Sequence, residues 1–200
     1  MNKRIIMVLE GETEVVFYKR MIDYIYSSCV KNPVVPRKNV EFILARGIGN
    51  MSARAVQTYK MRYSGGGYRN VVFCCFDTDV FDNGNLPGLW TEKTRDRFLD
   101  AGADEVYTIK ATHMIEDWFF YDYQGILKFL NLENISARRP EQLYGSTAAK
   151  RLNSLYKMSH KIYQKGYATD KLVDHLNIGK IYNCVKNEFK IFIREITTEL

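Results

Sequence analysis

The chain has 200 residues, of which 46% are hydrophobic and 26% charged. This is ordinary globular usage and excludes disorder, collagen-like repeats and a coiled coil for the whole chain. A chain of this length forms one large domain, or one domain with an appendage, and buries a core without disulfide bonds. The net charge of +6 is uneven, because residues 1–137 carry 17 basic and 17 acidic side chains whereas residues 138–200 carry 12 and 6.

Short apolar runs alternate with amphipathic segments in the first half of the chain. The predicted strands are residues 5–9, 40–45, 71–76 and 105–109, and the predicted helices are residues 15–25, 52–62 and 91–101. Such alternation predicts a parallel sheet with helices on both faces, a Rossmann-like α/β fold. The run 71–76 is apolar throughout, which is typical of a strand that is buried on both faces.

After residue 110 the pattern becomes helical. The predicted helices are residues 114–130, 140–163, 169–176 and 178–196. We therefore expect an α/β domain over residues 1–125 and a helical, basic extension over residues 126–200 that packs on it.

Acidic residues follow three of the four predicted strands. Glu10 comes directly after the first strand, Asp77 and Asp79 come directly after the third, and Glu116 lies a few residues beyond the fourth. In an open parallel sheet, ligands bind beyond the carboxyl ends of the strands, so we expect these carboxylates to converge. Glu14 faces the same crevice if it lies in the first turn of the following helix.

A cluster of carboxylates repels itself and needs a counter-charge. An all-oxygen set favours Mg²⁺ or Mn²⁺ over zinc, and two such ions can clamp the attacking and leaving oxygens of a phosphodiester. Simpler explanations stay open, since Asp77 and Asp79 also suit a turn or a helix cap and Glu116 suits a solvent-facing helix position.

At these residues the sequence resembles the Toprim domain of primases, topoisomerases and OLD-type nucleases. The run L-E-G-E-T-E at 9–14 is similar to the E-G-x-T-E motif of the OLD branch and of small stand-alone Toprim-like proteins of phage defence. The D-T-D at 77–79 matches the D-x-D motif, and M-I-E-D-W-F at 114–119 resembles the acidic-aromatic segment after the fourth strand of those small proteins. The resemblance covers roughly residues 1–125.

The resemblance implies a Toprim-like fold and a Mg²⁺- or Mn²⁺-dependent nuclease that cleaves DNA or RNA, in defence against phage or mobile elements. The implied metal ligands are Glu10, Glu14, Asp77, Asp79 and Glu116, and Glu10 would also act as general acid and base. In the nuclease branch a lysine beyond the acidic motifs stabilises charge in the transition state. Lys165 and Lys171 are the candidates, and we assign this catalytic role to Lys171.

Motifs of other Toprim proteins that this sequence lacks indicate which of their functions to expect. Topoisomerases tend to have a third aspartate where this chain has Phe81, and no zinc ribbon of the primase type is visible. The sequence also lacks the P-loop G-x-x-x-x-G-K-[ST], so the ATPase that accompanies OLD nucleases would be a separate partner. A nuclease is therefore favoured over a primase or a topoisomerase.

The basic last third of the chain predicts a surface for a polyanion. Our candidates for contact with nucleic acid are Lys150, Arg151, Lys161 and Lys165. A solvated helix face explains the same charges equally well. If the basic surface does bind nucleic acid, the chain is either a nuclease or a binding module that kept the fold without catalysis. Tyrosines in this region could stack on bases in both cases.

A haloacid-dehalogenase-type phosphatase is another alternative, because the strand 71–76 and the D-T-D that follows it fit that family's D-x-D-x-[TV] start. The residues that would serve it are Asp77 as nucleophile, Thr108 or Thr112 as the hydroxyl, and Asp170 with Asp174 as the late acidic pair. That motif usually lies on the first strand, whereas here two strand–helix units precede it. It also leaves Glu10 and Glu14 without a role.

The sequence also predicts a location. No apolar run approaches the roughly 18 residues of a membrane span, and residues 5–9 are too short for the core of a signal peptide. The four cysteines show no C-x-x-C spacing that would indicate zinc, so we expect reduced thiols. We therefore expect a cytoplasmic protein, for which a homo-oligomer stays open.

Overall fold

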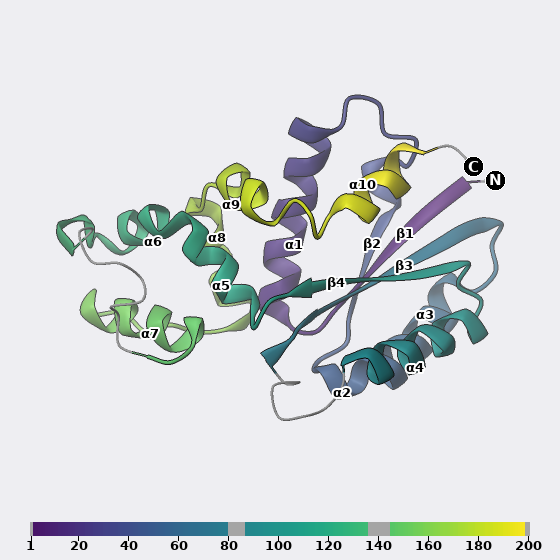
Figure 1. Cartoon of the computed structure of the whole chain (residues 1–200), viewed down its shortest axis with the longest axis horizontal. Coiled ribbons are helices and arrows are strands. Elements are labelled where there is room, and N and C mark those ends of the chain that lie inside the picture. The colour runs from purple at the N-terminus through teal and green to yellow at the C-terminus, as the bar shows by residue number, and fades with distance from the viewer. Residues whose placement is uncertain (1, 80–86, 136–144, 199–200) are drawn as a thin grey trace.

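A computed structural model of the chain describes residues 2–79, 87–135 and 145–198. Its centre is a four-stranded parallel sheet with the order β2-β1-β3-β4 (Figure 1). The strands are β1 (Asn2–Leu9), β2 (Val40–Leu44), β3 (Tyr68–Asp77) and β4 (Glu105–Ala111). The α/β fold class and the parallel sheet are thus confirmed.

Helices cover both faces of the sheet (Figure 1). The helices of the first half are α1 (Glu12–Tyr24), which continues as a π turn (Ile25–Cys29), α2 (Ile48–Asn50), a second π turn (Met51–Ala55), α3 (Val56–Tyr63) and α4 (Pro87–Asp100). The alternation along β1 explains the two layers. Ile5, Met7 and Leu9 join the core under α1, whereas Ile6 and Val8 join a second core with α3 and α4.

The second half of the chain is helical, as the sequence predicts. Its helices are α5 (Ile115–Phe119), α6 (Tyr123–Leu130), α7 (Ala148–Met158), α8 (Asp170–His175), α9 (Ile178–Val185) and α10 (Lys190–Thr197). Short 3-10 turns also occur at Arg37–Asn39, Phe120–Asp122, Glu133–Ile135 and Gly166–Thr169. Phe81 and the first residues of the predicted helix 140–163 lie outside the described residues.

Two of the predicted helices are in fact interrupted. The expected helix 114–130 breaks at Asp122, whose buried carboxylate accepts the backbone N–H of Asn177 at 2.8 Å and the ammonium of Lys180 at 3.1 Å. This tie to the start of α9 holds the backbone of Asp122 outside helical geometry. The expected helix 178–196 likewise divides into α9 and α10 at residues 186–189.

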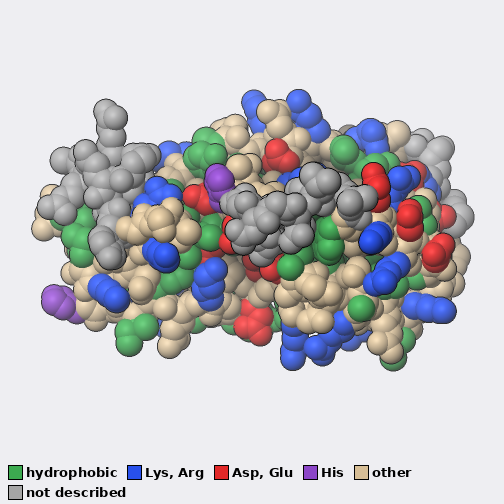
Figure 2. All heavy atoms as spheres, turned by 60° about the horizontal axis from the view of Figure 1, so that its bottom comes forward, with side chains coloured by type: hydrophobic (Ala, Val, Ile, Leu, Met, Phe, Trp, Pro, Cys, Tyr) green, Lys and Arg blue, Asp and Glu red, His purple; other side chains and the backbone are tan. Residues whose placement is uncertain are grey.

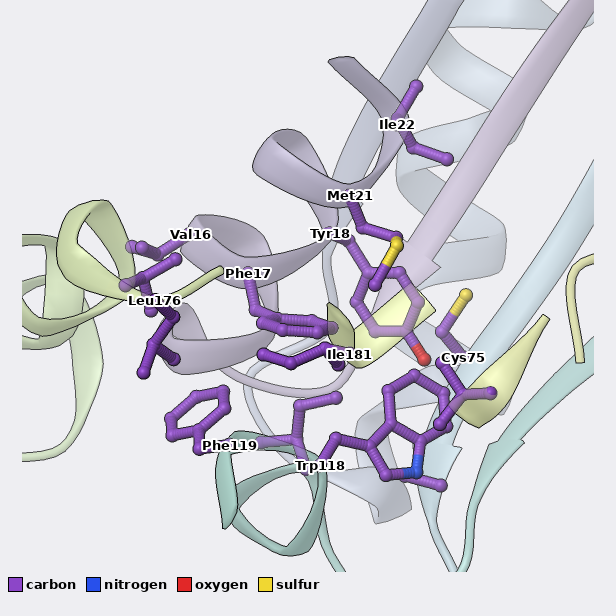
Figure 3. Close-up of a cluster of buried hydrophobic side chains, with 14 of the residues drawn as sticks. Val16, Phe17, Tyr18, Met21, Ile22, Cys75, Trp118, Phe119, Leu176 and Ile181 are labelled. Atoms are coloured by element: carbon purple, nitrogen blue, oxygen red, sulfur yellow. The ribbon is translucent and has the colours of Figure 1, made fainter. Parts of the chain in front are cut away.

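The C-terminal helices share one core with α1 and the sheet (Figure 3). The ring of Phe17 lies 5.4 Å from that of Phe119, and the ring of Tyr18 lies 6.2 Å from that of Trp118, between ring centroids. Ile181 of α9 belongs to the same cluster. This apolar contact is continuous across residue 125, and the domain boundary there stays a prediction.

The two ends of the described chain meet beside the sheet (Figure 1). The ammonium of Lys3 in β1 donates to the backbone carbonyl of Glu195 at 2.9 Å and to its carboxylate at 3.3 Å, and both side chains are buried. Lys3 also donates to the carbonyl of Thr198 at 3.2 Å. The last helix is therefore fixed to the first strand. Within the described residues, no helix is long and apolar enough to cross a membrane.

Candidate functional site

The strand register brings the acidic residues to one edge of the sheet. Leu9 is level with Leu44 of β2 and with Cys75 of β3, so β1 and β2 finish together and β3 runs two residues further, to Asp77. Glu10 follows Leu9 directly, and Asp77 is the last residue of β3. Pairing continues beyond β3, because the N–H of Asp79 donates to the carbonyl of His113 at 2.9 Å.

A cleft of about 520 Å³ opens at this edge. It is lined by Glu10, Gly11, Glu12, Thr13, Glu14, Leu44, Arg46, Gly47, Asp77, Asp79, Lys165 and Gly166. Figure 2 shows acidic side chains gathered through the middle of one face of the molecule, with Lys and Arg side chains to either side. The structure thus brings four of the predicted metal ligands to one cleft.

Glu10 lines this cleft directly after β1. Burial raises the pKa of Glu10, and repulsion by Asp79 adds to the increase, although the backbone at Asp77 and Ile48 favours the charged carboxylate. The buried Oε2 atom of Glu10 has no hydrogen-bond partner among the described residues. An unsatisfied buried carboxylate oxygen is costly without a cation or a proton.

Glu14 lies in the first turn of α1. Burial, with repulsion from Glu10 and Glu116, raises the pKa of Glu14 to about 7. Gly11 leaves the room that this side chain needs, since a Cβ atom at Gly11 would lie 2.7 Å from Glu14 Oε2. A larger residue at position 11 would therefore require the Glu14 carboxylate to move.

Asp77 carries the largest perturbation of the cluster. Burial, followed by repulsion from Glu14 and Glu10, raises the pKa of Asp77 to about 9. Its Oδ1 atom accepts the backbone N–H of Ile115 at 2.9 Å, which joins β3 to the start of α5. The same junction brings Glu116 beside the other carboxylates.

Glu116 is 1% exposed and makes two bonds through one oxygen. Its Oε1 atom accepts the Lys165 ammonium at 3.0 Å and the Tyr163 hydroxyl at 3.1 Å. Burial, together with Glu116, raises the pKa of Tyr163. The buried Oε2 atom of Glu116 has no hydrogen-bond partner in the described part of the chain. A solvent-facing role for Glu116 is therefore wrong.

Lys165 reaches the cleft because its loop docks on the start of α1. The N–H of Gly166 donates to the Thr13 hydroxyl at 2.8 Å. Partial burial lowers the pKa of Lys165, but Glu116 and the other carboxylates raise it by more, so the net shift is upward. Lys165 is thus a fixed cation at the acidic cluster.

Lys171 occupies a different place. It is an exposed residue of α8 and does not line the acidic cleft. The structure therefore brings Lys165, and not Lys171, to the position where a cation could act on a substrate. The sequence spacing does not show which of the two lysines reaches the cleft. The glycine that follows Lys165 is the one sequence signal of a tight turn there, and in the structure its φ is 88°.

The other candidates for nucleic-acid contact are spread over the helical part. Lys150 donates to the Ser146 hydroxyl at 3.3 Å, and Lys161 donates to the Phe129 carbonyl at 3.4 Å. Arg151 pairs with Asp117 at 3.8 Å. These three side chains do not line the cleft, whereas Lys165 does.

The carboxylates of the cleft, with Glu116 beside them, are the all-oxygen donors that suit a hard divalent cation. Among the described residues, Glu10 in the cleft and Glu116 next to it each have one buried carboxylate oxygen without a hydrogen-bond partner. Within the described residues, no group of three or more Asp, Glu, His or Cys side chains is already arranged to hold a metal ion. Binding of an ion would therefore require some carboxylates to rotate toward it.

The residues expected for a phosphatase are not gathered here. Asp170 and Asp174 pair with Arg20 of α1 and do not line the cleft that holds Asp77. Thr108 lines a separate cavity of about 360 Å³ beside β4.

Sequence reasoning missed the arginine of the cleft. Arg46, in the loop after β2, is exposed and lines the cleft, and its backbone has a φ of 61°. Nothing in the sequence singles out this arginine, because left-handed geometry is expected at its neighbour Gly47 instead.

Comparisons with known proteins bear on the fold. The sequence matches no family model and no curated protein. The chain is similar in fold to the C-terminal region of the Burkholderia pseudomallei OLD protein. The superposition covers 96% of this chain and 99% of that chain, with a TM-score of 0.50 and 13% identity. The likeness extends over the C-terminal helices, and at this identity it concerns the fold alone.

Proposed function

We propose that this chain is a Mg²⁺- or Mn²⁺-dependent nuclease of the Toprim type that cleaves phosphodiester bonds in DNA or RNA. The observation that carries the proposal is the shared cleft of Glu10, Glu14, Asp77 and Asp79, with Glu116 and Lys165 beside it. The similar fold of an OLD protein region agrees with it.

The carboxylates of the cleft would hold the cation. A bound divalent ion supplies charge stabilisation at a phosphodiester and lowers the pKa of attacking water. The raised pKa of Glu10 brings its proton exchange closer to neutral pH, which general acid and base work requires. Lys165 offers a cation for the charge that develops on the phosphorus oxygens.

The expected biological setting rests on the motifs alone. We infer a role in defence against phage or mobile elements in the cytoplasm, beside a separate ATPase partner. The basic helical part supports nucleic acid as the partner of the cleft, since 12 of the 29 Lys and Arg residues lie in residues 138–200.

A phosphatase is less favourable on the geometry around Asp77. The late acidic pair that would serve it, Asp170 and Asp174, pairs with Arg20 and does not line the cleft that holds Asp77. A trapped aspartyl-phosphate on Asp77 would nevertheless establish the phosphatase and reject the nuclease.

The test incubates plasmid, linear DNA and RNA with the protein in Mg²⁺ or Mn²⁺. We expect cleavage by the wild type and a loss of about 100-fold or more in Glu10→Ala and Asp77→Ala. Asp96→Ala is the matched control, because Asp96 is an exposed carboxylate of α4 outside the cleft. Cleavage that persists in both cleft variants would refute the site. Binding without cleavage that survives EDTA would indicate a binding module.

A further inference from the structure

Arg46 holds an unfavourable backbone conformation at the mouth of the cleft. Its φ of 61° lies in the left-handed region, where a side chain's Cβ atom crowds the backbone. The next residue, Gly47, has a φ of 106° and has no steric difficulty there. Arg46 therefore accepts a strain that a second glycine would avoid.

The surrounding loop enforces this conformation. Around Arg46, the N–H of Ala45 donates to the Leu9 carbonyl at 2.8 Å and the N–H of Gly47 donates to the Glu10 carbonyl at 2.8 Å. The side-chain amide of Asn50 donates to the Arg46 carbonyl at 2.8 Å. Two of these bonds join the residues on either side of Arg46 to Leu9 and Glu10, so the arginine is held beside the end of β1 and the Glu10 backbone. Strain that is over-determined in this way concentrates at binding sites.

The guanidinium group is not used within the protein. Among the described residues, the Arg46 side chain makes no hydrogen bond and no ion pair, although it lines a cleft with five carboxylates. The other cation of this cleft, Lys165, already bonds Glu116. A planar guanidinium suits the bidentate recognition of a phosphate.

We propose that Arg46 binds a backbone phosphate of the nucleic-acid strand in the acidic cleft. The inference rests on the proposed function, since it places a polyanion there. Arg46 would hold the strand against the repulsion of the carboxylates, and its strained backbone would fix the direction of the guanidinium. Arg46 acts as a binding residue and contributes no proton or nucleophile.

The test compares Arg46→Gly, Arg46→Lys and the wild type in binding to a labelled single-stranded DNA and to an RNA of the same sequence. Ca²⁺ replaces Mg²⁺, and a gel confirms that the strands stay intact. Affinity is measured over a series of salt concentrations. Arg54→Ala is the control, because Arg54 is exposed in the following helical turn and does not line the cleft.

We expect Arg46→Gly to bind about tenfold more weakly. The slope of log affinity against log salt should fall by about 0.7, which corresponds to one lost phosphate contact on a single strand. Its Tm should be no lower than that of the wild type, because glycine relieves the left-handed strain. Arg46→Lys should keep the slope and recover only part of the affinity, since an ammonium cannot form the bidentate contact.

Unchanged affinity and slope in Arg46→Gly, with normal binding by the wild type, would overturn the inference and leave the proposed nuclease intact. Equal losses in Arg46→Gly and Arg54→Ala would also overturn it, because the effect would then be one of net charge. Cleavage that persists in Glu10→Ala would refute the proposed function instead. A wild type that binds neither strand would reject both.

Discussion

Asp77 and Glu14 hold their protons more tightly in the folded chain than in an unfolded one. Their pKa values rise from ordinary carboxyl values to about 9 and about 7. The stability they contribute is therefore complete below about pH 4 and is lost as pH rises through those values. We expect the free energy of unfolding of Asp77→Asn to be higher than that of the wild type by more than about 1 kcal/mol at pH 8, as measured by urea unfolding in EDTA.

The same measurement at pH 3 provides the control for Asp77. Below the ordinary carboxyl pKa, Asp77 is uncharged in both the folded and the unfolded wild type, so the difference from Asp77→Asn should nearly vanish. Adding Mg²⁺ at pH 8 should stabilise the wild type more than Asp77→Asn, because a cation that binds the native site shifts the folding equilibrium. A difference that does not depend on pH would contradict the assigned shift.

Lys165 stabilises a carboxylate that is almost wholly buried. Lys165→Met would leave Glu116 with one fewer partner in the interior, and we expect a loss of about 1–2 kcal/mol in the free energy of unfolding at pH 8. Lys171→Met is the matched control and should change little, since Lys171 is exposed. Glu116→Gln added to Lys165→Met should restore much of the loss. A failure of that rescue would mean that Lys165 acts elsewhere.

The positions of the cleft residues could be predicted from the sequence where they depend only on where a strand ends. Glu10 and Asp77 follow apolar runs, and parallel strands bring such ends to one edge. The choice between Lys165 and Lys171 was not predictable, because it depends on the bond from Gly166 to Thr13, which joins residues 153 positions apart. Arg46 was missed for a similar reason, since its backbone geometry is imposed by bonds to β1.

At the scale of elements, the turn at Gly166 positions the loop that carries Lys165. Its φ is 88°, and a Cβ atom there would lie 2.7 Å from Glu12 Oε2. Gly166→Ala should therefore lower the free energy of unfolding by about 1–2 kcal/mol and reduce cleavage by displacing Lys165. Urea unfolding and a cleavage assay measure the two effects.

Gly49→Ala is the corresponding control for the loop. A Cβ atom at Gly49 meets nothing within 4 Å, so the free energy of unfolding of Gly49→Ala should stay within about 0.5 kcal/mol of the wild-type value. Equal effects of the two substitutions would show that the turn at Gly166 has no special geometry.

The strands were predictable as elements, but the division of the later helices was not. Apolar runs mark all four strands because each is short and bounded by turn residues. The break at Asp122 depends on its carboxylate reaching Asn177 and Lys180, a contact that the helical period of residues 114–130 does not reveal.

At the scale of the whole molecule, the shared core predicts that residues 1–125 do not fold alone. Removing residues 126–200 would remove the contact between Phe73 and Phe192, whose rings lie 5.6 Å apart. It would also expose the face of the sheet that α10 covers. We expect the fragment to lack a cooperative unfolding transition by circular dichroism, while the full chain unfolds in one step. A cooperative transition of the fragment would support the predicted boundary at residue 125.

The tie between Lys3 and the last helix has a practical consequence. Both termini of the described chain lie at the amino end of β1, and Glu10 lies past the eight residues of that strand, roughly 25 Å away. A fluorescent label or a surface tether joined at either terminus would therefore leave the opening of the cleft clear. The proposed cleavage could therefore be followed with the protein attached to a surface, without redesigning the chain.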